Sequence, residues 1–222
     1  MYIYINIYIY MPYYKSANLL FIHIPKTGGT NIENNIKQIH TQTLYSGETN
    51  TLLPSPYKKI SLQHQFIQTI YKHQETLNVD FTNIKMFTVV RNPYARIISD
   101  LFWFKLIKPE DNPAVVLNVM LNKYIFDGKL YDNHVEPQYK FISYKGKLIR
   151  NIKIFKCEEL NNINDELNEF LGFKINIINN NANKDYSKYL NQNSIALINK
   201  IYKKDFELFK YPMLPSTFDS NN

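Results

Sequence analysis

The segment PKTGGT contains the residue types that bind a phosphate-like anion. Gly28 and Gly29 let the backbone curl so that N–H groups point inward, and a helix beginning there would add a partial positive charge. Lys26 supplies a full charge, while Thr27 and Thr30 supply hydroxyl donors. Because the lysine precedes the glycines, the segment does not fit the Walker A pattern, in which the lysine follows them. The residues predict an anion-binding loop of another kind, and a plain strand-to-helix turn capped by Thr30 is the simpler alternative.

A second segment, FTVVRNPYARIISDLF, contains two of the three arginines in a chain whose lysines and arginines total 26. Arginine offers a planar, permanently charged fork that lysine lacks, so its position is informative in such a lysine-rich sequence. We expect Arg91 at the end of a strand and Ser99 two turns into the next helix, where both can reach a second anionic group. Arg96 is expected to pair with a carboxylate, and a structural ion pair is the alternative for Arg91. Two anion sites at strand ends predict a ligand with two phosphate-like groups.

Strand-like and helix-like segments alternate along the chain, and this alternation predicts an α/β fold. The apolar runs at 19–24, 85–90 and 152–156 are typical of buried strands in a parallel sheet. Helical spacing of apolar residues predicts a helix after the first motif, with Ile39 on its buried face. The predicted helices cover residues 30–39, 60–77, 93–106, 114–126, 158–171 and 194–209, the fifth of which ends at Gly172. We therefore expect a P-loop-like, three-layer domain with a central parallel β-sheet flanked by helices.

The composition indicates a folded protein with a basic surface. Hydrophobic residues make up 45% and aromatic residues 15%, which excludes a mainly disordered chain. A net charge of +7 favours anionic partners, although solubility alone explains it equally well. The single cysteine, Cys157, excludes a disulfide framework and a thiolate metal cage, and we expect it in the core. The sequence has no signal peptide, no run of 18 apolar residues and no Asn-x-Ser/Thr site, which favours a cytoplasmic location.

Together, the two motifs resemble those of the PAPS-dependent sulfotransferase superfamily, which takes a sulfuryl group from 3′-phosphoadenosine 5′-phosphosulfate (PAPS). FIHIPKTGGTNIE is similar to the family's 5′-phosphosulfate loop, and FTVVRNPYARIISDLF is similar to its 3′-phosphate element. HVEPQ, IKIFKCEEL and YKKDFELFKY resemble further stretches of the carbohydrate-type enzymes, in the family's order. The resemblance covers about residues 18–212. Residues 1–17, which are rich in Tyr and Ile, and the C-terminal tail 213–222 fall outside it. We expect residues 1–17 to be a poorly packed appendage; an added edge strand, an aggregation-prone tail and a translation start at Met11 are the alternatives.

The resemblance implies a role for each matching residue. The residues that would hold the 5′-phosphate and the sulfuryl group are Lys26, Thr27, Gly28, Gly29 and Thr30. Lys26 would also neutralise the leaving oxygen, so no metal would be needed. Arg91 and Ser99 would hold the 3′-phosphate, and the Asn-rich loop with Lys184, Tyr186 and Ser187 would close over the adenosine end.

Histidine is the leading candidate for the catalytic base, because the base must have a near-neutral pKa. His64 occupies a position that resembles the catalytic histidine of the glycan 2-O-sulfotransferases, and a surface histidine is the alternative. His134 is the second candidate for the base; we expect it to contact or orient the acceptor, and a structural role is the alternative. Glu33 is a third candidate base, with a solvated helix charge as the alternative, and His23 is expected to point into the sheet. The sequence leaves the choice among these candidate bases open.

The leading hypothesis is a PAPS-dependent sulfotransferase that acts on a hydroxyl of a carbohydrate or related acceptor. A P-loop-like nucleotide kinase or NTPase is one alternative, disfavoured by the position of the lysine and the lack of a Walker B strand end. A non-catalytic module that binds anions or glycans through the basic surface is another. No aromatic-basic motif indicates nucleic acid as the partner. The loops 41–59 and 107–140, which would select the acceptor, carry no readable code for its identity.

Overall fold

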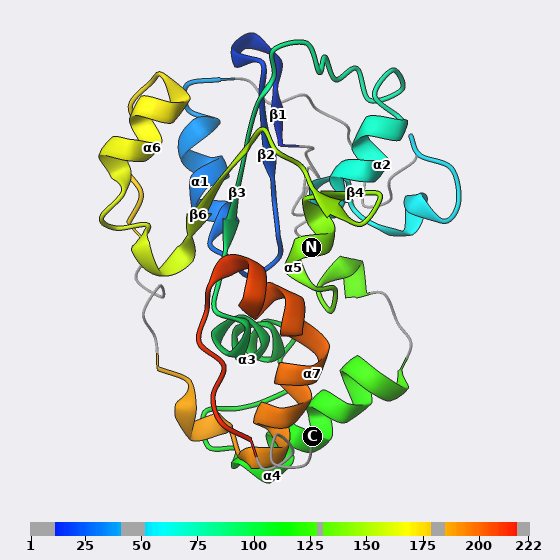
Figure 1. The fold of residues 1–222 in the computed structure, drawn as a ribbon, viewed down its shortest axis with the longest axis vertical. Coiled ribbons are helices and arrows are strands. Elements are labelled where there is room, and N and C mark those ends of the chain that lie inside the picture. Colours follow the sequence, from blue (N-terminus) through cyan, green and yellow to red (C-terminus); the bar gives the residue numbers. More distant parts are fainter. Residues whose placement is uncertain (1–11, 41–51, 128–130, 179–184, 217–222) are drawn as a thin grey trace, which may run out of the picture.

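The computed structural model has a central four-stranded β-sheet with helices on both faces (Figure 1). The structure describes residues 12–40, 52–127, 131–178 and 185–216. The strand order is β1-β2-β3-β6. β2 (Leu19–Ile22), β3 (Lys85–Val90) and β6 (Ile152–Lys156) run parallel to one another. Their carboxyl ends therefore meet at one edge of the sheet, where α/β proteins place their ligands.

The parallel strands form where the sequence predicts them, because their apolar runs are buried between helices. β3 and β6 have the predicted bounds, whereas β2 ends at Ile22, two residues early, because the chain turns there into the glycine loop. Phe21 stacks on Phe87 of the neighbouring strand with the ring centroids 4.7 Å apart. The Thr88 hydroxyl donates a hydrogen bond of 2.7 Å to the Ile22 carbonyl, which satisfies a polar group inside the sheet.

Helices cover both faces of the sheet, which gives the predicted three layers. Phe21 packs in one apolar cluster with α1 (Gly29–Ile36) and α6 (Asn164–Leu171). The next residue, Ile22, packs on the opposite face with α2 (Ile67–Lys72), because successive side chains of a strand point to opposite faces. Figure 1 shows α1 and α6 on one side of the sheet and α2 on the other. This arrangement confirms the predicted fold class.

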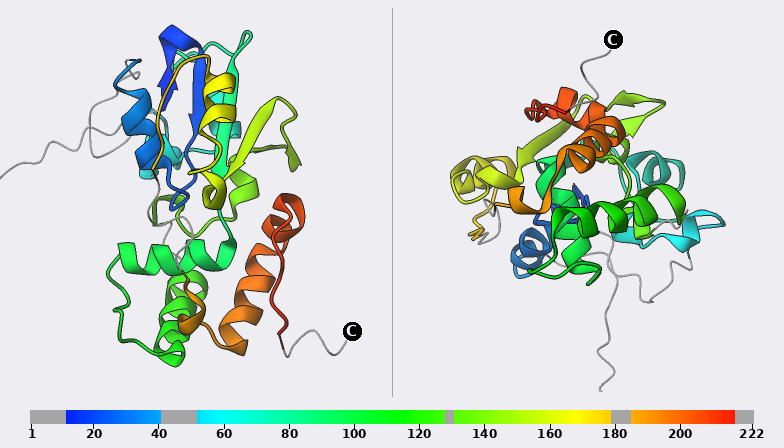
Figure 2. Two further views of the ribbon diagram at one scale, coloured as in Figure 1. Left: turned by 90° about the vertical axis from the view of Figure 1, so that its left-hand side faces the viewer. Right: turned by 90° about the horizontal axis from the view of Figure 1, so that it is seen from below.

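Three further helices gather beyond the carboxyl ends of the strands (Figures 1 and 2). α3 (Pro93–Trp103), α4 (Pro113–Leu121) and α7 (Gln192–Phe209) share a third apolar cluster. α3 begins directly after β3 because Asn92 caps it, accepting a 3.0 Å hydrogen bond from the Tyr94 amide, with proline at the first helical position. The remaining elements are α5 (Gln138–Phe141) and the hairpin of β4 (Ser143–Tyr144) and β5 (Lys147–Leu148).

The segment expected to be a poorly packed appendage contributes a strand to the sheet. β1 (Tyr13–Tyr14) pairs antiparallel with β2, and both tyrosines are buried. The Tyr13 hydroxyl donates to the Asn18 side chain over 3.0 Å, which ties the strand to the turn that follows it. For residues 12–17 the expectation is therefore corrected, because aromatic side chains at the sheet edge complete both apolar clusters. Residues 1–11 lie outside the described part of the chain.

The helix predicted over residues 60–77 is interrupted directly after His64. A 3-10 turn covers Leu62–His64, two extended residues follow, and α2 begins only at Ile67. The Gln65 side chain donates to the Tyr57 and Ile60 carbonyls, and these bonds hold the chain in the extended form. His64 therefore projects from a short turn rather than from the face of a regular helix.

Other helices are also shorter than their apolar patterns predict, and α3, expected to reach residue 106, ends at Trp103. The helix expected from residue 114 ends as α4 and continues as a π-helical turn over Asn122–Phe126. The helix expected from residue 158 is a 3-10 turn over Cys157–Glu159 followed by α6, which ends at Gly172 in the left-handed conformation (φ 83°), as predicted. Ile39, expected on a buried helical face, lies beyond the end of α1 and is 48% exposed.

Candidate active site

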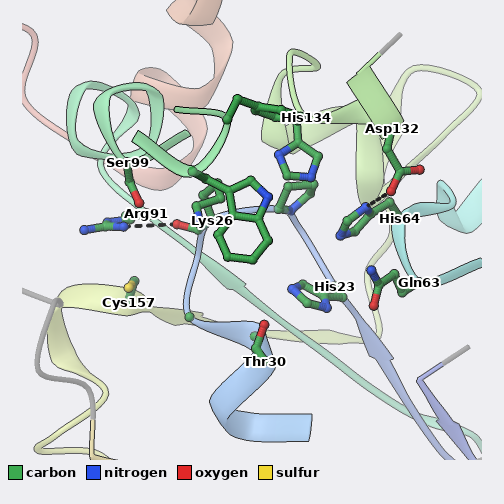
Figure 3. A pocket seen from close by; sticks show the side chains of 15 residues that line it. His23, Lys26, Thr30, Gln63, His64, Arg91, Ser99, Asp132, His134 and Cys157 are labelled. Atoms are coloured by element: carbon green, nitrogen blue, oxygen red, sulfur yellow. Dashed lines mark hydrogen bonds and ion pairs between the residues drawn. The ribbon is translucent and has the colours of Figure 1, made fainter. Parts of the chain in front are cut away.

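Both predicted anion-binding motifs line one cavity of about 430 Å³ at the carboxyl ends of the parallel strands. The predicted site residues that line it are Lys26, Gly28, Gly29, Thr30, His64, Arg91, Ser99 and His134. Figure 3 shows Arg91 and Ser99 at one end of this cavity. His64 and Asp132 lie at the other end, and Lys26 lies between them. The site therefore has a cationic end and a histidine-rich end.

The glycine loop forms a cradle at the start of α1. Gly28 adopts φ 91°, a left-handed conformation that glycine takes without strain, and the helix begins at the next residue. A side chain on Gly29 would place its Cβ 2.5 Å from the His23 ring, so the loop needs a bare backbone there. The Thr27 hydroxyl donates to the Ile24 carbonyl over 2.9 Å and does not line the cavity, so this hydroxyl braces the loop instead of facing a ligand.

Lys26 lies at the centre of the cavity, in a left-handed backbone conformation (φ 67°) that is uncommon outside glycine. Its Nζ lies 4.2 Å from the centre of the Trp103 ring. Burial lowers the pKa of Lys26, Asp100 opposes this shift, and Arg91 adds to it. Lys26 therefore lies in a partly desolvated site, where a cation interacts strongly with an anion.

Arg91 is buried at the end of β3 and is held by its backbone. Its N–H donates to the Gln138 side-chain oxygen and its carbonyl accepts from the Gln138 side-chain nitrogen, both over 2.8 Å. Its Nη1 donates to the Lys26 carbonyl over 3.2 Å, which links the two motifs. The guanidinium lies 5.7 Å from the centre of the Tyr186 ring, so the described part of the predicted adenosine loop reaches this end of the cavity. Lys184 lies outside the described residues.

Each of the three histidines that line the cavity has its Nδ1 within hydrogen-bond distance of a carboxylate. The pairs are His23–Glu33 at 2.5 Å, His64–Asp132 at 2.6 Å and His134–Asp100 at 2.6 Å. Because a carboxylate accepts, Nδ1 carries the proton in each ring and Nε2 is left as the proton acceptor. The ring centroids of His64 lie 5.2 Å from those of His23 and 5.1 Å from those of His134. The three imidazoles therefore form one contiguous row.

His64 is held in position by residues 131–133, a loop that is distant in the sequence but packs against it. Asp132 also accepts from the Ser61 amide (2.6 Å) and hydroxyl (2.7 Å), and Asn133 donates to the His64 carbonyl over 2.9 Å. Residues 131–133 all adopt left-handed backbone conformations with φ between 46° and 63°. Three consecutive non-glycine residues in this conformation are costly, and such strain is concentrated at functional sites. Burial lowers the pKa of His64 to about 4, so the ring is neutral at pH 7.

His134 is positioned by a buried ionic network. Asp100 on α3 accepts from the His134 ring, and its other oxygen lies 2.5 Å from Lys123 Nζ. The Tyr124 hydroxyl donates to that same oxygen over 3.0 Å. The histidine and lysine partners lower the pKa of Asp100 against the opposing effect of burial, which keeps the carboxylate charged. Burial in turn lowers the pKa of His134.

Arg96 has a structural role, as expected, but its partners differ from the predicted carboxylate. It is fully buried, and its guanidinium donates to the carbonyls of Pro25 (3.0 Å), Glu136 (3.0 Å) and His134 (2.9 Å). One side chain of α3 therefore joins the glycine loop to the segment that carries His134. A planar fork with several donors can make three such bonds, whereas a lysine ammonium cannot match its geometry.

The later sequence motifs, YKKDFELFKY and IKIFKCEEL, hold the backbone segments that carry the site residues. Asp205 on α7 accepts from the backbone N–H groups of Gln138 and Tyr139 at the start of α5. The Tyr202 hydroxyl donates to the Val135 carbonyl over 2.8 Å. Glu158 accepts from the Asn92 amide, at the turn between β3 and α3. The C-terminal helix thus supports the segment after His134, and the β6 end supports the second motif.

The structure contradicts the expectation for His23 and the alternative given for Glu33. His23 does not point away into the sheet, because its ring lines the cavity (Figure 3). The ring also occupies the space that a Cβ on Gly29 would need. Glu33 is not a solvated helix charge, because it is 4% exposed and bound to His23. It does not line the cavity, so it acts on the site only through His23. Cys157 is buried, as expected, although it also borders the cavity.

Sequence reasoning missed Asp132, Asp100 and Trp103, which all contact the predicted site residues. Asp132 lies only two residues before His134, and Asp100 directly follows Ser99, so both were close to motifs already singled out. Nothing in the local pattern distinguishes them from other acidic residues, because their partners come from distant parts of the chain.

One group of side chains has the composition of a metal site. His64, Asp132 and His134 offer ligand atoms that all lie within 4.8 Å of one another. Hydrogen bonds account for this proximity, since both rings are already held by carboxylates through Nδ1. The prediction that no metal is needed remains a prediction.

A scan against protein-family models identifies the chain. The Sulfotransferase family matches residues 13–212, and the chain belongs to this family. Membership supports sulfuryl transfer as the general activity. Searches of curated proteins and of solved structures gave no match. Among the described residues, no helix combines the length and hydropathy needed to cross a membrane.

Proposed function

We propose that this protein is a PAPS-dependent sulfotransferase that transfers the sulfuryl group to a hydroxyl of a carbohydrate or related acceptor. One observation carries the proposal. The glycine loop, with Lys26, and the second motif, with Arg91 and Ser99, line a single cavity whose other end holds His64 and His134. A donor with anionic groups at two positions fits the first part, and a hydroxyl awaiting deprotonation fits the second.

The residues present suit the donor. The cradle before α1 offers backbone N–H groups and a helix start, and the cavity holds a lysine and an arginine. Gly28, Gly29, Thr30 and Lys26 would hold the 5′-phosphosulfate, while Arg91 and Ser99 would hold the 3′-phosphate. Thr27 would contribute through its backbone alone, because its hydroxyl is bound to Ile24. Bound PAPS supplies the sulfuryl group that is transferred.

His64 is the base that this geometry favours. Its Nδ1 proton is held by Asp132, so Nε2 can accept the proton of the acceptor hydroxyl. The acceptor oxygen forms a bond to sulfur while the bond from sulfur to the phosphate oxygen breaks, and the hydroxyl proton passes to His64. Lys26 neutralises the charge that develops on the departing phosphate oxygen. His134, fixed by Asp100, orients the acceptor hydroxyl beside His64.

Ligand binding and turnover test the proposal together. We expect PAP, the desulfated product 3′,5′-ADP, to raise the thermal midpoint more than ATP does. PAP at about 100 times its dissociation constant should stabilise the fold by about 2.7 kcal/mol. Lys26→Ala should lower PAPS-dependent sulfation of a saccharide panel by about 10²- to 10³-fold. Lys200→Ala, an exposed lysine on α7, should leave it unchanged.

Two results would contradict the proposal. Magnesium-dependent ATP turnover without any response to PAP would instead favour a nucleotide kinase or NTPase. Binding of anions with steep salt dependence, but without PAP binding, would favour a non-catalytic module. Treatment with EDTA, followed by removal of the chelator, should leave sulfation unchanged. A loss that Zn²⁺ or Mn²⁺ restores would overturn the metal-free mechanism.

A further inference from the structure

The acceptor end of the cavity has an aromatic wall next to the histidine row. Trp103, the last residue of α3, lines the cavity and is 65% exposed. Phe104 follows it, also lines the cavity, and lies with its ring centroid 5.0 Å from that of His134. Trp103 and Phe104 together place aromatic surface inside the cavity, beside the candidate catalytic groups, and such a wall suits an apolar face of a ligand.

Trp103 stands where donor and acceptor must meet. The Lys26 ammonium rests 4.2 Å from the centre of its ring, and Lys26 is the residue assigned to the leaving oxygen. The next residue, Phe104, packs edge to face against His134, the histidine assigned to the acceptor. A group stacked on the indole would therefore lie between the transferred sulfuryl group and the histidines.

The groups around this wall select the chemistry of the acceptor. Gln63 and Asp132 line the same cavity, and both are partly exposed polar side chains that can bind hydroxyl groups. A pyranose ring combines an apolar C–H face with hydroxyl groups around its edge. A simple phenol has an apolar face but no further hydroxyl groups for these polar side chains.

We propose that Trp103 forms an acceptor subsite on which the pyranose ring of a saccharide stacks, with one hydroxyl directed to His64. The inference rests on the proposed function and adds the residue that selects the acceptor. The saccharide contacts the indole through its C–H face and Gln63 through an edge hydroxyl. Trp103 binds the acceptor and takes no part in the proton transfer.

The sequence provides a direct probe, because Trp103 is the one tryptophan in the chain. Intrinsic tryptophan fluorescence therefore reports this residue alone. With PAP bound first, we expect addition of a heparosan or desulfated chondroitin hexasaccharide to change the Trp103 emission in a saturable way. We expect 4-nitrophenol, the phenolic comparison, to be sulfated with a much lower kcat/KM than the better saccharide.

Steady-state kinetics separates acceptor binding from donor binding. Trp103→Ala should raise the KM for the saccharide by about tenfold, while the KM for PAPS changes less than twofold. Trp103→Phe should recover part of the loss, because it restores a flat apolar face. Phe126→Ala removes an aromatic side chain that is 72% exposed outside the cavity, and it should change neither constant. Thermal midpoints of the variants check that each one folds.

The outcomes distinguish the inference from the proposed function. If PAP stabilises the protein but neither saccharide changes the emission, the acceptor subsite is wrong and the function stands. The same conclusion follows if Trp103→Ala leaves the saccharide KM unchanged, raises both KM values equally, or if the phenol is the better acceptor. If PAP does not bind at all, the proposed function itself fails.

Discussion

At the scale of single residues, the site depends on carboxylates that hold imidazoles. Asp132 and Asp100 each bind the Nδ1 of a cavity histidine at 2.6 Å, which fixes the ring and its tautomer. The two acids differ in their surroundings. Asp132 is partly exposed and held by Ser61, whereas Asp100 is buried with Lys123. These pairings turn ordinary side chains into oriented groups.

Asp132→Asn tests the orientation of the proposed base. The amide keeps the shape of the side chain but can offer an N–H to His64, which would favour the wrong tautomer. We expect kcat to fall by about 10²-fold or more, while the PAP dissociation constant changes less than twofold. Turnover kinetics and calorimetric PAP binding measure the two quantities. Asp165→Asn, an exposed position on α6, is the matched control, and equal losses in both variants would contradict the role of Asp132.

At the scale of elements, α3 and β1 make contacts with distant parts of the chain that the sequence analysis did not predict. The Arg96 side chain of α3 joins two segments that lie 109 residues apart in the sequence. Its guanidinium donates to the Pro25 carbonyl in one segment and to the His134 carbonyl in the other. β1 closes the edge of the sheet with two buried tyrosines. We therefore expect substitutions at Arg96 and in β1 to change the free energy of unfolding.

Arg96→Lys should destabilise the fold. The shorter list of donors on lysine would leave buried carbonyls of Pro25 or Glu136 without a partner, at a cost of about 3 kcal/mol. Urea unfolding measures the change in the free energy of unfolding. Arg150→Lys replaces an exposed arginine and should change it by less than about 0.5 kcal/mol. Similar values for the two variants would show that Arg96 is not a structural junction.

The two tyrosines of β1 should respond oppositely to loss of their hydroxyl groups. Tyr14 is buried, and within the described residues its hydroxyl has no hydrogen-bond partner, so Tyr14→Phe should stabilise the fold by about 1 kcal/mol. The Tyr13 hydroxyl donates to Asn18 and accepts from the Asp80 amide, so Tyr13→Phe should destabilise it by about 1 kcal/mol. Thermal or urea unfolding gives both signs. Changes of the same sign would contradict the packing of this strand.

The sequence predicted the elements that depend on local patterns and missed those that depend on distant contacts. The bounds of β3 and β6 follow from continuous apolar runs, and the loop at Gly28 follows from its own residues. The pairing of His64 with Asp132 joins residues 68 positions apart, so no local pattern contains it. The break before α2 also depends on such a contact, because the Gln65 side chain competes for backbone carbonyls.

At the scale of the whole molecule, the buried histidines link stability to pH. Burial lowers the pKa of His64 to about 4, against the favourable effect of Asp132, and the neighbouring His23 and His134 lower it further. Burial also lowers the pKa of His134. The unfolded chain therefore binds more protons than the folded protein between about pH 6.5 and pH 4. Stability should be full above this range and fall as the pH drops through it.

His64→Gln tests this linkage. The free energy of unfolding of the parent should fall toward acid by up to about 1.4 kcal/mol per pH unit for each such histidine. The variant should show a shallower slope between pH 6.5 and pH 4, measured by urea unfolding at several pH values. His40→Gln alters a histidine outside the cavity and should keep the parent slope. An unchanged slope in His64→Gln would contradict the depressed pKa.

Several side chains of the candidate site lie on one helix, and this limits which insertions and deletions the protein can accept. Arg96, Ser99, Asp100 and Trp103 all belong to α3. Arg96 binds the Pro25 carbonyl, Asp100 binds the His134 ring, and Ser99 and Trp103 line the cavity. A helix is a rigid ruler that advances about 1.5 Å and turns about 100° per residue. One inserted residue in the middle of α3 would rotate all later side chains by about 100° around the helix axis relative to the earlier ones. Changes in chain length should therefore be tolerated between the helices, and within α3 only exchanges of one residue for another.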